Sequence, residues 1–103
     1  MAEPYVSIAW FRVKPGRNQD FEWAFHDAGM LTRPEVTGGY LGARLHRATD
    51  GSNQYFVLGH WTTVESYAQW QTIAAEGAPQ EALNRMMDAL EKNRPGVLVE
   101  PLD

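Results

Sequence analysis

Hydrophobic and polar residues alternate along two segments in the middle of the chain, 39–46 and 55–61, with a turn at Asp50-Gly51 between them. This alternation predicts two β-strands joined as a hairpin, because successive side chains of a strand point to opposite faces. One face then carries apolar side chains: Leu41, Ala43, Leu45, Phe56 and Leu58. The other face is smaller and more polar: Gly42, Arg44, His46, Val57, Gly59 and Trp61. We interpret the first face as packing surface and the second as one wall of a ligand cavity.

The segment before this hairpin predicts a strand and a helix. Residues 5–13 are rich in apolar and aromatic side chains and are followed by Lys14-Pro15-Gly16, which favours an opening strand and a turn. From Asn18 onward, apolar residues recur at helical spacing. We expect Asn18 to cap this helix and Pro34 to stop it.

The segment after the hairpin predicts two more helices and a last strand. A capping box formed by Thr62 and Glu65 begins the second helix, which breaks near 77–79. A third helix ends at 94–96, and a strand over 97–100 follows. The complete order predicts an α+β, ferredoxin-like fold with a four-stranded antiparallel sheet and helices on one face.

The second face of that sheet is left without cover. It would form an apolar patch larger than a soluble monomer usually exposes: Val6, Ile8, Trp10, Leu41, Leu45, Phe56 and Leu58. We therefore predict a homodimer in which two sheets stack about 10 Å apart. The helix-side face is mostly small, so the helices should leave a cavity above it.

Composition narrows the possible functions. The 103 residues predict a single domain spanning 1–103, and 44% hydrophobic residues favour a folded chain. A formal net charge of -4 with scattered basic residues argues against nucleic-acid binding. No cysteine is present, so disulfides and thiolate chemistry are excluded. Neither a signal segment nor an apolar run of about 20 residues is found, and we expect a cytoplasmic protein without a membrane span.

Three segments carry a resemblance to a known family. They are Val13–Gly16 with Phe21, Gly39–Gly42, and Trp61–Tyr67 with Trp70. Over nearly its full length the chain resembles the antibiotic biosynthesis monooxygenases, which are dimeric α+β barrels. The series His46, Thr49-Asp50-Gly51, Trp61 and Tyr67 is similar to the branch that oxidises polycyclic aromatic polyketides.

What this resemblance implies is a small aromatic substrate, molecular oxygen and no cofactor. Val57 stands where that branch usually has asparagine. The haem-degrading branch uses Asn, Trp and His at positions that match Ala9, Trp70 and Gln80, so two of its three pocket residues are missing. The resemblance therefore does not favour haem degradation by that branch's mechanism.

Candidate catalytic residues are His46, Tyr67 and Trp61. On the proposed cavity face, His46 is a candidate general base, or else a solvent-bonded edge histidine. Trp61 has an indole to stack on an aromatic substrate and an N–H to donate, and core packing explains it equally. Tyr67 has a hydroxyl for a phenolate or peroxide oxygen, with packing as the alternative.

Candidate substrate-binding residues extend this cavity: Arg44, Val57, Gly59, Phe11, Trp70 and Met86. Arg44 would favour an anionic intermediate if buried. Trp70 and Met86 stand at helical spacing, which is also typical of core residues. The three histidines lack metal-ligand spacing, so we predict no metal site.

The leading functional hypothesis is a cofactor-independent monooxygenase that oxidises a hydrophobic phenolic, anthrone or quinol-type molecule to a quinone. Two alternatives stay open on the same scaffold. One is a dimer that binds a small molecule without chemistry, which the loss of the asparagine at Val57 favours. The other is a polyketide cyclase or isomerase, which needs acid–base residues but no oxygen.

Overall fold

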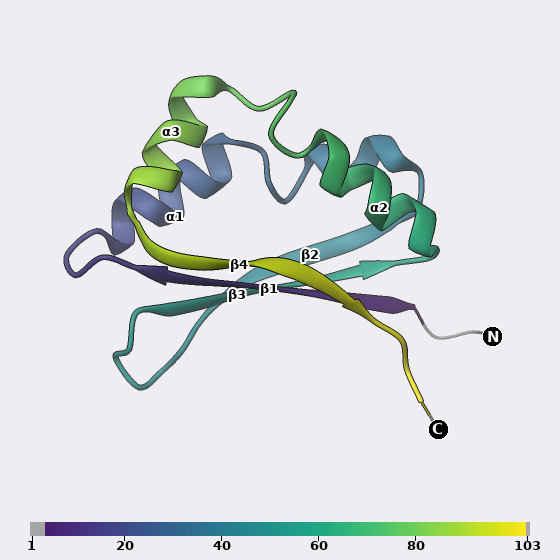
Figure 1. Cartoon of the computed structure of the whole chain (residues 1–103), viewed down its shortest axis with the longest axis horizontal. Coiled ribbons are helices and arrows are strands. Elements are labelled where there is room, and N and C mark those ends of the chain that lie inside the picture. Colours follow the sequence, from purple (N-terminus) through teal and green to yellow (C-terminus); the bar gives the residue numbers. More distant parts are fainter. Residues whose placement is uncertain (1–3, 103) are drawn as a thin grey trace.

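Four antiparallel strands form one sheet in the order β2-β3-β1-β4, with the helices on one of its faces (Figure 1). This computed structural model describes residues 4–102; the chain ends at 1–3 and 103, which the predicted domain includes, lie outside the described residues. The elements in chain order are β1 Tyr5–Val13, α1 Asn18–Asp27, the 3-10 helix η1 Arg33–Thr37, β2 Tyr40–Arg47, β3 Gln54–Trp61, α2 Val64–Ile73, α3 Gln80–Asp88 and β4 Leu90–Val99. The predicted α+β, ferredoxin-like fold is confirmed. None of the helices in residues 4–102 is long and apolar enough to cross a membrane.

The helix starts differ from the predictions by one residue. The N-cap of α1 is Arg17, whose side chain does not cap the helix, and Asn18 is already helical. In α2 the cap is Thr63, whose hydroxyl oxygen accepts from the Ser66 N–H at 3.1 Å. The predicted Thr62 and Glu65 capping box is therefore wrong, because Thr62 lies before the cap.

The final strand is much longer than predicted. The third helix ends at Asp88, and β4 begins at Leu90 rather than at Val97. Its pairing with β1 shifts between Ile8 and Trp10, where Pro95 and Gly96 lie in the strand. A proline is tolerated there because β4 is an edge strand and the shift leaves residues outside the regular ladder.

An irregularity in β2 reverses the predicted faces of that strand. Tyr40 pairs with Trp61, but Gly42 pairs with His60, so one extra residue enters the ladder at Leu41. Gly42 has φ of 122°, a conformation open to glycine. Beyond a β-bulge, every side chain points to the face opposite to the one that simple alternation predicts. Ala43 and Leu45 accordingly share the helix side with their partners Gly59 and Val57.

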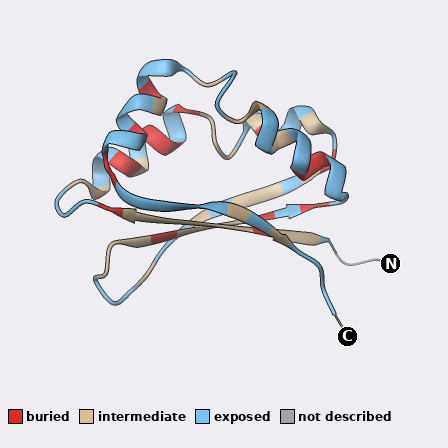
Figure 2. Ribbon diagram, viewed as in Figure 1, coloured by how far each residue is buried: buried red, intermediate tan, exposed pale blue. Residues whose placement is uncertain are grey.

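The main hydrophobic core lies between α1, α3 and one end of the sheet. Figure 2 shows buried residues concentrated on the inner sides of these helices. Phe21, Phe25 and Tyr55 form its aromatic centre. The centroid of the Phe21 ring lies 5.8 Å from that of Phe25 and 4.9 Å from that of Tyr55. Phe11 and Met86 pack into this core. The other end of the helix-side face, beneath α2, is packed less fully.

Candidate functional site

A cavity of about 250 Å³ lies between the sheet and α2. Its floor consists of small strand residues, among them Ser7, Ala9, Ala43 and Gly59. Helix α2 supplies the wall through Tyr67, Trp70 and Gln71, and Trp61 closes the end of β3. Small side chains below and aromatic side chains around produce a mostly apolar space with a few polar groups, which is typical of small-molecule sites.

Trp61 is 2% exposed and forms the aromatic end of the cavity. Its ring contacts Tyr67 edge-on at a centroid distance of 5.3 Å and Tyr40 at 5.1 Å. The indole Nε1 donates to Ser7 Oγ at 2.9 Å. The hydrogen bond that the sequence predicts from this N–H is therefore made to a buried serine, and Trp61 presents the surface of its ring to the cavity.

Tyr67 brings a hydroxyl from α2 to the cavity. The phenolic oxygen accepts from Gln71 Nε2 at 3.1 Å, so its own hydrogen is left to donate. It approaches β4 at Gly96, where any side chain larger than hydrogen would overlap the hydroxyl. Burial raises the pKa of Tyr67, because the phenolate loses hydration. The residue is thus a neutral hydrogen-bond donor near neutral pH.

Trp70 is held beside the cavity by Arg33, a half-buried arginine. The Arg33 guanidinium lies 5.2 Å from the Trp70 ring centroid and donates to the carbonyl oxygens of Ala28, Ile73 and Ala74 at 2.9–3.1 Å. These bonds tie the start of η1 to the end of α2. The wall of the cavity is therefore fixed by contacts outside it.

The structure brings together five of the nine predicted site residues. Trp61, Tyr67, Val57, Gly59 and Trp70 all line the cavity. Phe11 and Met86 do not line it, because their side chains pack in the core between α1 and α3. Ser7, Tyr40 and Gln71 line it without having been predicted as site residues. A serine in a strand gives no sign of a site until its neighbours across the sheet are known.

His46 and Arg44 lie on the uncovered face of the sheet, and their predicted placement in the cavity is wrong. Beyond the bulge they share a face with Phe56 and Leu58. Both border a shallow depression together with Leu41 and His60. His46 Nδ1 lies 3.2 Å from the carbonyl oxygen of Arg44. A sheet thus separates the His46 imidazole from Tyr67, and His46 is no base for chemistry in that cavity.

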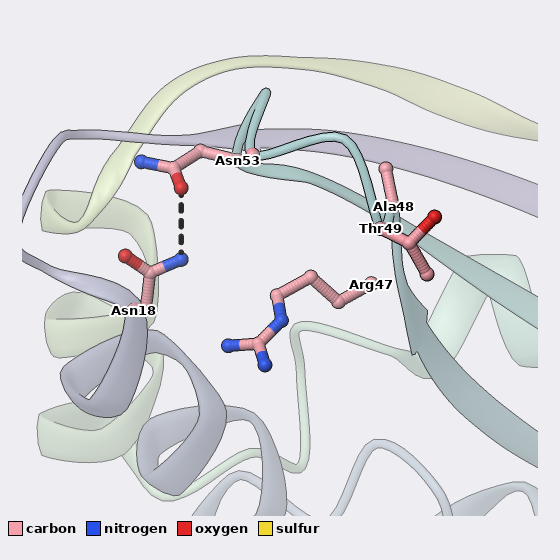
Figure 3. A pocket seen from close by; sticks show the side chains of 6 residues that line it. Asn18, Arg47, Ala48, Thr49 and Asn53 are labelled. Carbon is pink, nitrogen blue, oxygen red and sulfur yellow. Dashed lines mark hydrogen bonds between the residues drawn. The ribbon is translucent and has the colours of Figure 1, made fainter.

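A second hollow, of about 470 Å³, lies between the β2-β3 hairpin and the start of α1. Figure 3 shows Arg47 reaching across it toward α1 while Asn18 bonds to Asn53. Asn18 Nδ2 also donates to Tyr55, and Tyr55 donates to Glu22 at 2.5 Å. Because these polar groups bond to one another, we interpret this region as the attachment of the hairpin to α1.

Comparison with known proteins identifies relatives of the chain. Residues 4–82 match the family model for antibiotic biosynthesis monooxygenase. Two strains of Mycobacterium tuberculosis have a haem oxygenase (mycobilin-producing) that is 34% identical over 68 residues, which is 65% of this chain and 62% of the relative. The chain thus matches less than two thirds of the length of these relatives.

Solved structures share the fold at low sequence identity. SnoaB, a cofactor-independent oxygenase from Streptomyces nogalater, is 19% identical with a TM-score of 0.71, over 99% of this chain and 96% of that one. A NIPSNAP family protein from Agrobacterium tumefaciens is 14% identical with a TM-score of 0.75, over 100% and 90%. At these identities the likeness concerns the fold.

Proposed function

The chain belongs to the antibiotic biosynthesis monooxygenase family, and on this premise we propose that it is a cofactor-independent monooxygenase of a hydrophobic, polyketide-like substrate. The substrate class is a phenol, anthrone or quinol that is oxidised to a quinone. The observation that carries the proposal is the buried Tyr67 hydroxyl, which keeps a free hydrogen inside an aromatic-walled cavity. A hydroxyl so placed suits the oxygen of a phenol or anthrone.

In the proposed reaction the substrate itself supplies the electrons. At the methylene carbon of an anthrone, two hydrogens are lost and one atom of O₂ becomes the new carbonyl oxygen. The other oxygen atom leaves as water together with the two hydrogens. Tyr67 donates a hydrogen bond to the substrate oxygen, on which negative charge develops when the first proton leaves. The apolar walls keep water away from the anion while it reacts with oxygen.

No carboxylate or imidazole is among the residues found to line the cavity in 4–102. Tyr67 does not serve as the base, because its raised pKa keeps it protonated near neutral pH. We therefore assign the first proton to solvent, which takes it up as the substrate enters and before the apolar walls enclose the anion. This assignment requires a substrate that is itself acidic, as anthrones and phenols are once their anion is stabilised.

Haem degradation, the activity named for the curated relatives, is not supported by the cavity. Haem iron is commonly held by a histidine, and His26, His46 and His60 all lie outside the lining. Ala9 and Trp70 line the cavity, but Gln80 lies at the exposed start of α3. The donor groups present therefore do not fit a histidine-ligated haem.

We also propose that the protein is a homodimer through the uncovered face of the sheet. Val6, Ile8 and Trp10 of β1 share this face with Phe56 and Leu58 of β3. Leu45, which was predicted to belong to it, packs toward the helix-side core instead. The proposed occupant is a second copy, because an equal apolar sheet covers the whole face at once.

The test of the proposed reaction is oxygen uptake by the purified protein with 1,8-dihydroxyanthrone, after subtraction of uncatalysed autoxidation. We expect saturable uptake with formation of the anthraquinone. The Tyr67→Phe variant should lose about 100-fold in turnover, the usual effect of removing one donor to an oxyanion. His46→Ala, on the other face, is the control and should keep the parent's rate.

The possible results separate the alternatives. Oxygen-independent conversion of the substrate would support a cyclase or isomerase. Binding without conversion would support a binding protein. Equal turnover by Tyr67→Phe and the parent would contradict the role proposed for Tyr67.

A further inference from the structure

Ser7 is a buried polar residue within the cavity lining. Its exposed fraction is 7%, and it lies on β1 opposite Gly59 of β3. The serine oxygen accepts the hydrogen bond from Trp61 Nε1. A hydroxyl that accepts in this way still has its own hydrogen to donate. Ser7 therefore offers a donor to whatever occupies the cavity.

The position of this hydroxyl depends on Gly59. A Cβ atom at Gly59 would lie 2.6 Å from Ser7 Oγ and 3.1 Å from Trp61 Nε1. The glycine thus provides the space in which the serine and the indole meet. Gly96 does the same beneath the Tyr67 hydroxyl. Two hydroxyl groups, each accepting from a neighbouring side chain, consequently border one small cavity.

We propose that Ser7 is a specificity-determining residue, whose hydroxyl donates to a carbonyl or phenolate oxygen of an aromatic ligand. A ligand with such an oxygen satisfies the buried donor, whereas a hydrocarbon of the same shape leaves it unpaired. The inference rests on the proposed function only in taking this cavity as the ligand site. It concerns binding and is independent of turnover.

The test compares 1,4-naphthoquinone with naphthalene, which share one ring frame and differ in two carbonyl oxygens. Equilibrium dialysis gives the dissociation constant of each, and the ratio measures selectivity for the oxygens. The chain has no cysteine that the quinone could alkylate. We expect Ser7→Ala to lower the parent's preference for the quinone about fivefold, the usual effect of one hydrogen bond. Its affinity for naphthalene should stay near that of the parent.

Ser66→Ala is the matched control, because Ser66 is buried to the same degree, at 8% exposed, and lies outside the lining. It should keep the parent's ratio. If Ser7→Ala does not fold, Ser7→Cys serves instead, since its thiol is a weaker donor of similar shape. Because a thiol would add to the quinone, this variant is compared with the parent on 1-tetralone and tetralin, which differ in one carbonyl oxygen, and the preference for the ketone should fall.

An unchanged ratio in the folded Ser7 variant would overturn the proposal, as would a parent that does not prefer the quinone or binds neither ligand. The two proposals can also fail separately. If the protein takes up no oxygen but its ligand preference still depends on Ser7, the monooxygenase function is contradicted and the role of Ser7 is supported.

Discussion

Tyr67 and Trp61 contribute to the cavity in different ways, although both are buried aromatic residues beside it. The Trp61 N–H is bound to Ser7, so the residue offers a ligand the surface of its ring. Tyr67 accepts from Gln71 and offers a hydrogen. Exchanging either residue for phenylalanine therefore removes a different property. In Trp61 the change leaves Ser7 without its donor, and in Tyr67 it removes the donor to the ligand.

Buried tyrosines make stability depend on alkaline pH. Burial raises the pKa of Tyr40, Tyr55 and Tyr67, and the Glu22 carboxylate raises that of Tyr55 further. Above about pH 10 the unfolded chain loses phenolic protons that the folded chain still holds, so the free energy of unfolding falls as pH rises. Below that pH the tyrosines bind their protons in both states and the dependence disappears.

Urea unfolding at several pH values between about 8 and 11 measures this dependence. Tyr67→Phe should show a shallower alkaline decline than the parent, because one shifted group has been removed. The same decline in both proteins would show that Tyr67 ionises as readily in the folded chain as in the unfolded one.

At the scale of elements, local chemistry sets where α2 begins. Thr63 is the cap, and Ser66 supplies both the N–H that Thr63 accepts and a hydroxyl 2.9 Å from it. Thr63→Ala should lower the free energy of unfolding by about 1 kcal/mol, the usual value of an N-cap. Thr62→Ala is the matched control and should cost less, since Thr62 lies outside the helix. Urea unfolding measures both losses of free energy. If Thr62→Ala cost as much as Thr63→Ala, or more, the capping box predicted at Thr62 would be the true one.

Regular alternation predicted β1 and the faces of β3 correctly, and with them Trp61, Val57 and Gly59. It failed in β2 and β4, where the pairing slips by one or more residues. A bulge is a property of two strands together, so neither strand's own pattern of apolar residues reveals it. His46 and Arg44 were misplaced for this reason, while Ser7 gained meaning only through Gly59 on the next strand.

At the scale of the whole molecule, residues 4–102 cover one sheet face with helices and place no element over the other. On the uncovered face the guanidinium groups of Arg12 and Arg94 lie 5.4 and 5.2 Å from the centroid of the Trp10 ring. A stable dimer needs a large buried interface, and a partner buries enough of this face only by covering several strands at once. The proposed dimer therefore involves the strands rather than the helices.

Phe56→Glu places a charge in the middle of this face and should convert the dimer to a monomer, because a buried unpaired carboxylate is strongly unfavourable. Light scattering coupled to size-exclusion chromatography measures the mass. Val36→Glu is the control, since Val36 is 67% exposed in η1, on the helix side of the sheet. A parent that elutes as a monomer, or a Phe56→Glu variant of unchanged mass, would contradict the dimer.

The extra residue at Leu41 decides which side chains of β2 the cavity contains. If the same strand paired with β3 in plain alternation from Tyr40 and Trp61 onward, Arg44 would lie opposite Val57 and His46 opposite Tyr55, so both would replace Ala43 and Leu45 on the helix side. This shift of register by one residue would exchange an apolar wall for one with a cation and an imidazole, without a change to the residues of the strand. A change in the pairing register of this hairpin is therefore a route by which one scaffold acquires a general base and a new reaction.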